Sequence, residues 1–373
     1  MQMLPNPQPF FADLPDPRRE TRNKLHKLED IVMITLCAVL GGYEDWVSIE
    51  DFGYANETWL RGFLELPNGI PSHDTLSDVI GRINGDTFAK AFSEWVRAGL
   101  PELAGHQVAI DGKSLRGSRG EDATVHVISA FATQARLVLA AKAIPDKANE
   151  ITAIPGLLAQ LDLTGAVVTI DAMGCQRNIA KAIIDQGADY VLALKENHPT
   201  LHEDIKLWLD DSDAQGHVRM HPTVEKDHGR IETRRTVVSN ELDWLAQKED
   251  WCGLKAVAMV ESIREISDKV SCERRYYLCS FTDVTRIALT IRHHWAIENQ
   301  QHWILDVQFG EDAHRTRKDH SAANLGLIRR TALNLLQQDT SNKWSIRRRK
   351  MRSLVDLPYR ETRLFKNGLI ATT

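Results

Sequence analysis

The stretch Ala166-Val167-Val168-Thr169-Ile170-Asp171 decides the fold of this chain of 373 residues. Four consecutive β-branched residues stand before Asp171, a run typical of a central strand that is buried on both faces of a sheet. A second run, residues 107–111, also ends on an aspartate. We therefore predict two buried strands that each end on a carboxylate.

Further strands and helices alternate around these two runs. Two strands with a close turn between them are expected after the first run, and one strand after the second. Apolar periodicity predicts helices in between, which gives the order strand, strand, strand, helix, strand, helix, strand, helix. This order predicts an α/β fold with an RNase H-like mixed sheet and helices on both faces. The other strands are 125–132, 136–143 and 189–194, and the helices are 150–162, 176–186 and 200–209.

The chain as a whole divides into five segments of different character. We predict a helical N-terminal domain over 1–104, with DNA-end binding as one role for it, and the first part of the core over 105–215. β-type runs replace the helical pattern over 216–282, which indicates a β-rich insertion. Helices of the core resume over 283–340, and 341–373 is a basic C-terminal tail.

The charge of the chain is unevenly distributed. Residues 1–100 hold 9 Lys and Arg against 15 Asp and Glu, whereas residues 315–373 hold 14 against 4. This asymmetry indicates that a local surface meets a polyanion. The five cysteines never form a C-x-x-C pair, and the apolar run 31–42 is too short to span a bilayer and is expected to be a buried helix. With no signal peptide in sight, we expect a cytoplasmic protein without a membrane segment.

Asp111 and Asp171 are expected to lie side by side, because their strands are predicted neighbours that point the same way. Two carboxylates at close range repel each other unless one is protonated or a divalent cation binds. Oxygen ligands of this kind suit Mg²⁺ or Mn²⁺ rather than zinc. The alternative is that each aspartate only caps a helix, since Asp is a favoured N-cap residue.

A third carboxylate is expected from residues 291–306, IRHHWAIENQQHWILD, which we predict to form one helix. Glu298, His302 and Asp306 recur at four-residue intervals and line one stripe of that helix. Glu298 would complete a site of three carboxylates able to hold two metal ions about 3.5–4 Å apart. His302 and Asp306 are candidates for holding DNA or for supporting the site. Spacing does not exclude three alternatives to Glu298, namely Asp306, Glu311 and Asp312.

Polar and basic residues near the predicted sheet edge, in the insertion and in the tail are candidates for DNA contact. A solvated surface is the alternative for the residues that follow Asp111 and for Arg230. For the basic tail, phosphate contact is favoured over structural packing. The candidates are Lys113, Ser114, Arg116, Lys195, Asn197, Arg230, Arg292, His302, Arg315, Arg317, Arg347, Arg348 and Arg349.

Several blocks of the sequence resemble those of the H-repeat-associated, ISAs-type insertion-sequence transposases of the DDE superfamily. The resemblance covers nearly the whole chain, and the combination of blocks is more specific than any one of them. The blocks are AIDGKSLRG at 109–117, TIDAMGCQ at 169–176, YVLALKEN at 190–197, WAIEN at 295–299, HWILDV at 302–307, FGED at 309–312 and the turn at 69–75.

This resemblance implies a DDE transposase with an RNase H-like catalytic domain, which depends on Mg²⁺ (or Mn²⁺) and cuts and joins double-stranded DNA at element ends and target. Carried over, Asp111, Asp171 and Glu298 would be the catalytic and metal-binding residues of a two-metal phosphoryl transfer. A homodimer and a nucleoid-associated bacterial protein are also implied. Relatives with an insertion carry Tyr, Arg and Lys near the glutamate, and formation of a DNA hairpin stays open because this chain has Ile291, His294 and Leu305 there.

Three functions are compatible with these residues. The first is a transposase that cuts and joins DNA strands, and the second is a domesticated DDE nuclease or recombinase that nicks DNA without transposing. The third is a catalytically silent DNA-binding protein on the same fold. Loss of a carboxylate would favour the third, and none is lost, whereas inverted repeats flanking the gene would distinguish the first from the second.

Overall fold

The structure, a computed structural model, describes residues 3–22, 24–100, 102–119, 124–145, 150–214, 216, 218–227, 230–266 and 269–365. The chain forms two compact units, each assembled from separate segments. The helix-rich unit comprises Met1–Pro101, Gly112–Asn149 and Glu298–Thr373, and the sheet unit comprises Glu102–Asp111 and Glu150–Ile297. The chain therefore leaves the sheet unit directly after Asp111 and again directly before Glu298.

The strands of the described residues follow the hydrogen-bonding order β3-β2-β1-β4-β5-β9-β8-β7-β6. The first five of these positions confirm the predicted RNase H-like order, in which three strands that are consecutive in sequence precede two that are reached through helices. β1 is common to both units, since it continues past Asp111. The bounds are β1 Gln107–Ser114, β2 His126–Ala132, β3 Leu137–Ile144, β4 Val167–Ile170, β5 Asp189–Leu194, β6 Arg219–Asp227, β7 Arg230–Ser239, β8 Ala256–Ile266 and β9 Lys269–Cys279.

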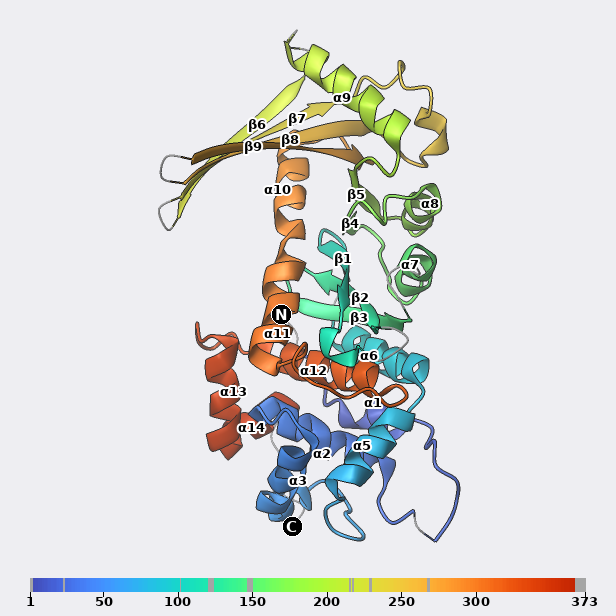
Figure 1. Ribbon diagram of the computed structural model, residues 1–373, viewed down its shortest axis with the longest axis vertical. Coiled ribbons are helices and arrows are strands. Elements are labelled where there is room, and N and C mark those ends of the chain that lie inside the picture. The colour runs from blue at the N-terminus through green and yellow to red at the C-terminus, as the bar shows by residue number, and fades with distance from the viewer. Residues whose placement is uncertain are drawn as a thin grey trace. The chain divides into compact units, whose positions relative to one another are not determined.

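Three parallel strands, β1, β4 and β5, form the centre of the sheet unit. β1 pairs with β4 and β4 with β5, and the register joins Ile110 to Ile170 and Ile170 to Leu192. The helices α7 (Glu150–Leu158) and α8 (Arg177–Asp185) cover one face, and α10 (Val284–His294) covers the other (Figure 1). The paired parts of these strands are mostly apolar because both faces are buried. The predicted helices on both faces are confirmed.

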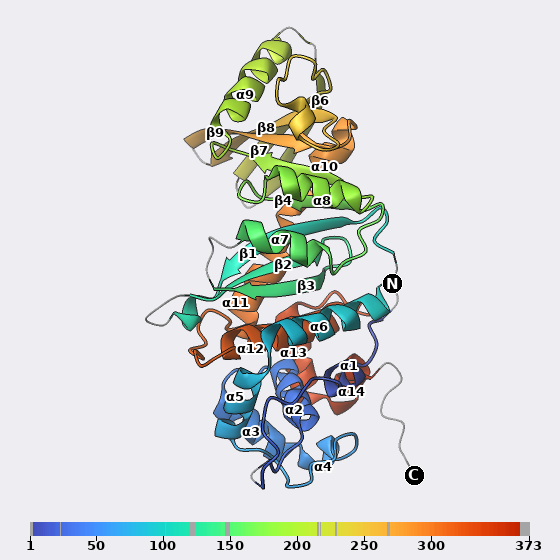
Figure 2. The same cartoon turned by 90° about the vertical axis from the view of Figure 1, so that its right-hand side faces the viewer.

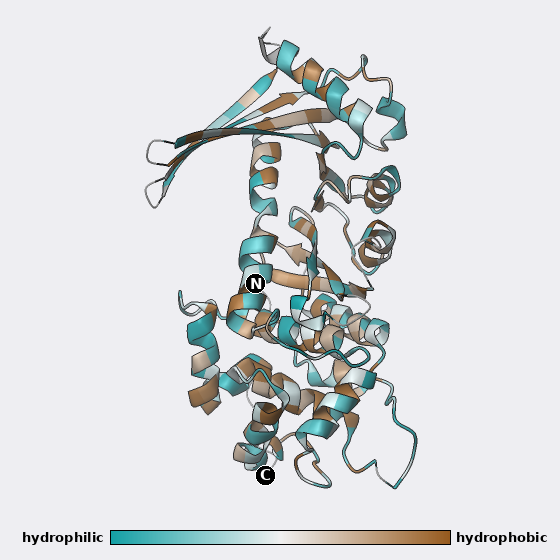
Figure 3. Ribbon diagram, in the orientation of Figure 1, coloured by the Kyte–Doolittle hydropathy of each residue, from teal (hydrophilic) through white to brown (hydrophobic). Residues whose placement is uncertain are grey.

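The predicted β-rich insertion is an antiparallel arrangement of β6, β7, β8 and β9. It continues the central strands, because β9 pairs antiparallel with β5. The helix α9 (Pro199–Ala214) lies on one side of these strands and α10 on the other (Figure 1). β8 and β9 are buried where they lie near α10 and exposed towards their far ends, where the ribbon is mostly hydrophilic in colour (Figure 3).

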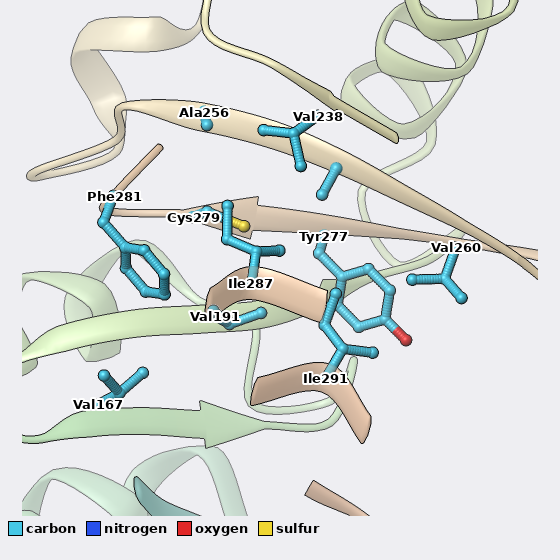
Figure 4. Close-up of a cluster of buried hydrophobic side chains, with 11 residues drawn as sticks. Val167, Val191, Val238, Ala256, Val260, Tyr277, Cys279, Phe281, Ile287 and Ile291 are labelled. Atoms are coloured by element: carbon cyan, nitrogen blue, oxygen red, sulfur yellow. The ribbon is translucent and has the colours of Figure 1, made fainter. Parts of the chain in front are cut away.

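A cluster of buried apolar side chains fixes α10 to the strands of the sheet unit. Ile287 and Ile291 of α10 lie one helical turn apart and face Val191 of β5 and Tyr277 of β9 (Figure 4). All four are at most 8% exposed. This packing sets the position of the chain shortly before it reaches Glu298.

The helix-rich unit is built around α12 (Ser321–Gln337), which is buried from Ser321 to Leu336. Helices that precede and follow it in the chain pack on it, as does β3 (Figure 2). The others are α1 Gln8–Ala12, α2 Leu28–Gly41, α3 Trp46–Ala55, α4 Glu57–Leu60, α5 His73–Arg82, α6 Gly85–Gly99, α11 Trp303–Phe309, α13 Ile346–Val355 and α14 Leu357–Leu364.

Two buried asparagines connect α12 to its neighbours. Asn334 accepts a hydrogen bond from the backbone N–H of Val138 (2.9 Å) and donates one to the carbonyl of the same residue (2.8 Å). Asn324 donates to the carbonyls of Ile80 and Ile83 (2.8 and 2.9 Å). Each side chain thus satisfies backbone groups that would otherwise be buried without a partner.

Among the described residues, no single helix has the length and hydrophobicity needed to cross a membrane. The pair α2 and α3, bent by 96°, meets that requirement only by length and composition. α2 contains residues 31–41 of the apolar run and is almost completely buried, as predicted for a core helix.

Candidate active site

Asp111 and Asp171 occupy adjacent positions on neighbouring strands of the sheet unit. β1 and β4 run parallel, and their last paired residues are Ile110 and Ile170. The aspartates directly follow this pair, so their side chains leave the same face from strands about 4.8 Å apart. Both residues are partly exposed. β1 does not end at Asp111 as predicted, because it continues to Ser114.

The carboxylate of Asp171 also holds a turn. Its Oδ1 accepts hydrogen bonds from the backbone N–H groups of Met173 (3.1 Å) and Gly174 (3.3 Å). It does not cap α8, which begins at Arg177. A Cβ on Gly174 would lie 2.2 Å from the Cγ2 of Ile170, so only glycine fits this turn without a shift of the strand. The sequence thus orients the carboxylate through a glycine three residues later.

The face of the sheet that carries the two aspartates is the face covered by α10. Gln107 and Thr169 lie on that face, at even spacing from Asp111 and Asp171. The amide of Gln107 donates to Thr169 Oγ1 (3.2 Å) and to the carbonyl of Thr290 in α10 (2.9 Å), and Thr169 Oγ1 lies 2.9 Å from His294 Nδ1. Sequence reasoning missed this buried polar contact, although the even spacing from the aspartates could have indicated it.

The prediction of one helix over 291–306 is correct only in part, because the helix is interrupted at Trp295 and includes a π-helical turn. α10 ends at His294, a π-helical turn (η4) spans Glu298–His302, and α11 follows as Trp303–Phe309. Three basic residues, 292–294, stand in the last turn of α10, where cations stabilise a helix end. Apolar periodicity does not show such a break, because the stretch contains neither Gly nor Pro. π-helical turns are rare and frequently mark functional sites.

Glu298 is hydrogen-bonded to His302 across the π-helical turn. Its Oε2 lies 3.0 Å from His302 Nδ1, and the imidazole is 3% exposed while the Glu298 side chain is 55% exposed. The hydrogen bond from His302 lowers the pKa of Glu298, against the opposing effect of partial burial, and Lys113 lowers it further. Glu298 is therefore held as a carboxylate, the form that binds a cation.

Lys113 does not lie where a phosphate could reach it easily. Its side chain is 8% exposed, and its ammonium lies 2.7 Å from Asp306 Oδ1 and 2.8 Å from Asp312 Oδ1. Burial acts to lower the pKa of Lys113, but Glu311, Asp306 and Asp312 outweigh it and raise the pKa. We therefore reassign Lys113 from DNA contact to an ion pair inside the helix-rich unit.

Arg116, Arg315 and Arg317 are exposed on two loops that pack together in the helix-rich unit. Arg317 Nε donates to the carbonyl of Gly117 (3.4 Å). A Cβ on Gly117 would lie 2.1 Å from the carbonyl oxygen of His314, so the loops approach as closely as glycine permits. The hydroxyl of Ser114, the last residue of β1, lies 3.0 Å from His126 Nδ1, and Ser114 is exposed.

The residues of the sheet unit that are predicted to contact DNA also lie at its surface. Lys195 and Asn197 are exposed in the loop after β5, and the Asn197 amide donates to the carbonyl of Ala172 (2.8 Å) in the loop that follows Asp171. Arg292 is exposed on α10 and pairs with Glu225 (3.0 Å). Arg230 begins β7, and its side chain lies outside the described part of the chain.

The segment 341–373 is not a simple basic tail, because its described part forms α13 and α14. Arg347 and Arg348 are exposed, whereas the guanidinium of Arg349 donates to the carbonyl of Leu336 (2.8 Å). Lys350 and Arg360 are buried, which corrects the prediction that this segment favours phosphate contact over packing. A basic residue has a long apolar stem, so charge alone does not predict exposure.

Both units carry side chains of the kind that divalent metal ions bind. In the sheet unit these are the carboxylates of Asp111 and Asp171, and in the helix-rich unit they are the carboxylate of Glu298 and the imidazole of His302. Carboxylate oxygens prefer hard cations such as Mg²⁺ and Mn²⁺. The donor set therefore fits the metal that the sequence predicts.

Comparisons with known proteins agree with this chemistry. The transposase DDE domain matches residues 105–335, and the domain associated with it matches residues 9–96. The putative transposase YncI of Escherichia coli O157:H7 is 39% identical, over 94% of this chain and 92% of the relative. The H repeat-associated putative transposase YhhI of Escherichia coli K12 is 38% identical, over 94% of this chain and 96% of the relative.

Among solved structures, the piggyBac transposase in a synaptic complex with hairpin DNA aligns with a TM-score of 0.49 and 11% identity, over 98% of this chain and 82% of that chain. The family match covers more than half of the chain, and two relatives cover nearly all of it. The predicted resemblance to the H-repeat-associated transposases is thus confirmed, and the chain belongs to the DDE transposase family.

Proposed function

We propose that this protein is an active DDE transposase in which Asp111, Asp171 and Glu298 bind divalent metal ions and catalyse DNA strand cleavage and transfer. The observation that carries the proposal is the register of β1 and β4, which follows Ile110 and Ile170 with two aspartates on one face. The Glu298 carboxylate, held ionised by His302, supports the third position.

A bound pair of Mg²⁺ or Mn²⁺ ions would activate water or a 3′-hydroxyl and stabilise the leaving oxygen of an in-line phosphoryl transfer. Residues of the protein would supply the metal ligands and hold them in position. Asp111 and Asp171 supply oxygen ligands from a rigid sheet, and the turn at Gly174 fixes the Asp171 carboxylate. His302 orients Glu298 and keeps it ionised.

Exposed basic and polar residues would hold the DNA. Arg116, Arg315 and Arg317 form one basic surface on packed loops, and Lys195 and Asn197 lie in the loop after β5, next to the loop that follows Asp171. Contacts of this kind go mainly to phosphates and position the duplex without reading its sequence. Two active sites acting on two element ends would further require a homodimer.

The test is strand cleavage of DNA that carries the ends of the element, with the variants Asp111→Asn, Asp171→Asn and Glu298→Gln. Each should lose Mg²⁺-dependent cleavage by a factor of at least about 10³ while still binding the DNA. Asp162→Asn is the matched control, because Asp162 is exposed before the opposite end of β4. Full cleavage by any of the three variants would remove that residue from the site.

A domesticated nuclease that cuts DNA without transposing is the second function, since it requires the same three carboxylates. Strand transfer distinguishes the two. A transposase joins the released 3′ end to target DNA, whereas a nuclease releases the end and produces no joined product under the same conditions.

A further inference from the structure

Lys113 is a buried lysine among the residues proposed for DNA contact. It stands two residues after Asp111 on β1, so both side chains leave the same face of the strand. Its ammonium contacts Asp306 (2.7 Å), Asp312 (2.8 Å) and Glu311 (3.6 Å), all within the helix-rich unit. A lysine that is 8% exposed and faces three carboxylates is committed to the protein interior.

A second layer of charge lies behind these carboxylates. Glu311 is 2% exposed and pairs with Arg330 (2.7 Å), which is itself fully buried on α12. Arg329 is also buried and acts electrostatically on Glu311. The buried charge of Glu311 is therefore balanced by three cations, Lys113, Arg329 and Arg330. Removal of one cation would upset that balance.

The ion pair between Lys113 and Asp306 connects two pieces of chain that carry proposed catalytic residues. Asp306 lies on α11, two turns after Glu298 in the chain, and His302 stands between them. His302 contacts Glu298, and Asp306 contacts Lys113. The link therefore runs from the end of β1, next to Asp111, to the helix that presents Glu298.

We propose that Lys113 is a positioning residue for the proposed metal ligands Asp111 and Glu298: within the helix-rich unit, its ion pairs with Asp306 and Asp312 hold the strand end that directly follows Asp111 to the helix that follows Glu298. This inference rests on the proposed function, because it assumes that those two carboxylates are metal ligands. Partners of metal ligands typically change metal affinity or activity by roughly 10–100-fold when they are replaced.

The sign of the effect on metal binding distinguishes positioning from a simple effect of charge. If Lys113 acted only through its charge, its removal would make the site more negative and would strengthen the binding of a cation. If it positions the ligands, its removal weakens binding although the local charge becomes more favourable. A purely structural residue would lower stability and leave metal affinity unchanged.

The experiment measures Mn²⁺ binding to the full-length protein by the loss of the free Mn²⁺ signal in electron paramagnetic resonance. Lys113→Met should weaken binding roughly 10–100-fold. Asp306→Asn should give a similar loss, and the double variant should be no worse than either single one, since both remove the same pair. Arg360→Met is the matched control, because it removes a buried cation from α14 of the same unit and should leave Mn²⁺ affinity unchanged.

Unchanged or tighter Mn²⁺ binding by a folded Lys113→Met protein would overturn the inference, and so would an equal loss in Arg360→Met. Circular dichroism establishes that each variant is folded, and if Lys113→Met fails to fold, Asp306→Asn carries the test alone. The outcome is separable from the proposed function. If Asp111→Asn cleaves DNA normally, the proposed function fails, whereas loss of cleavage there with unchanged Mn²⁺ affinity in Lys113→Met overturns only the role of Lys113.

Discussion

At the scale of single residues, the environment of each carboxylate sets its chemistry. Asp171 accepts two backbone N–H groups, Glu298 is held ionised by His302, and Asp306 is neutralised by Lys113. Asp306, Glu311 and Asp312 were alternatives to Glu298 by spacing. In the structure all three contact Lys113, which favours Glu298 as the carboxylate left for a metal ion.

Gly174 provides a test of how precisely Asp171 is held. In Gly174→Ala the new methyl group would meet Ile170 at 2.2 Å, so the turn or the strand end must shift. We expect a loss of about 1–3 kcal/mol of unfolding free energy and a clear fall in cleavage rate. Urea denaturation and the cleavage assay measure the two effects. Gly156→Ala, where nothing lies within 4 Å on α7, should be neutral or slightly stabilising, and a neutral Gly174→Ala would contradict the account.

At the scale of elements, α12 holds the helix-rich unit together through a few buried polar side chains. Asn334→Ala would leave the backbone N–H and carbonyl of Val138 in β3 buried without a partner. Each such group costs about 1–3 kcal/mol, so unfolding in urea should show a loss of roughly 2–5 kcal/mol. A loss below 1 kcal/mol would show that water or another side chain replaces the amide.

The loop between Gly310 and α12 should make stability dependent on pH. Burial, together with the nearby Arg329, lowers the pKa of His314 to about 4. The unfolded chain, with an ordinary histidine pKa near 6.5, binds a proton at higher pH than the folded chain does. The folding stability that depends on a neutral His314 is therefore fully present above pH 6.5 and is lost as the pH falls towards 4. Between pH 7.5 and 5 the free energy of unfolding, measured by urea denaturation, should fall by about 1–2 kcal/mol more in the wild type than in His314→Gln. Equal losses in the two proteins would contradict this prediction.

The elements of the sheet were predictable from sequence, and the break in the helix near Glu298 was not. The run at 166–171 predicts a buried strand through its consecutive β-branched residues, and the neighbouring strands 107–111 and 189–194 contain similar apolar runs. The π-helical turn at Glu298–His302 adds no distinctive residue to the pattern. The contact of Lys113 with Asp306 shortly after this turn joins residues far apart in the chain, and local sequence patterns do not reveal such contacts.

At the scale of the whole molecule, the units are assembled from segments that are separate in sequence. Residues 1–101 and the C-terminal helices belong to the same unit as the helix with Glu298. Sequence patterns cannot show this, because they report only on residues that are close together in the chain. The sequence also does not show that some basic residues of 341–373 pack inside the protein while others are exposed. Arg360 donates to Ser353, Leu354 and Asn56, whereas Arg347 and Arg348 are exposed.

We expect different consequences from mutation of the buried and of the exposed basic residues of this segment. Removal of residues 341–373 should lower the melting temperature strongly, because α13 and α14 pack in the helix-rich unit. The double variant Arg347→Gln/Arg348→Gln should keep its melting temperature and bind DNA more weakly, with the slope of log affinity against log salt reduced by about 2. Thermal melts and binding titrations at several salt concentrations measure this. An unchanged salt slope would exclude both arginines from phosphate contact.

The most direct test of the central claim is a change of metal specificity at Asp171. In Asp171→Cys a thiolate replaces a carboxylate, and thiolates are poor ligands for Mg²⁺ but bind softer metals. We expect no DNA cleavage by this variant with Mg²⁺ and a partial return of cleavage with Mn²⁺, whereas Asp162→Cys should cleave equally well with both metals. Full cleavage by Asp171→Cys in Mg²⁺ alone would contradict the claim that this side chain holds the catalytic metal.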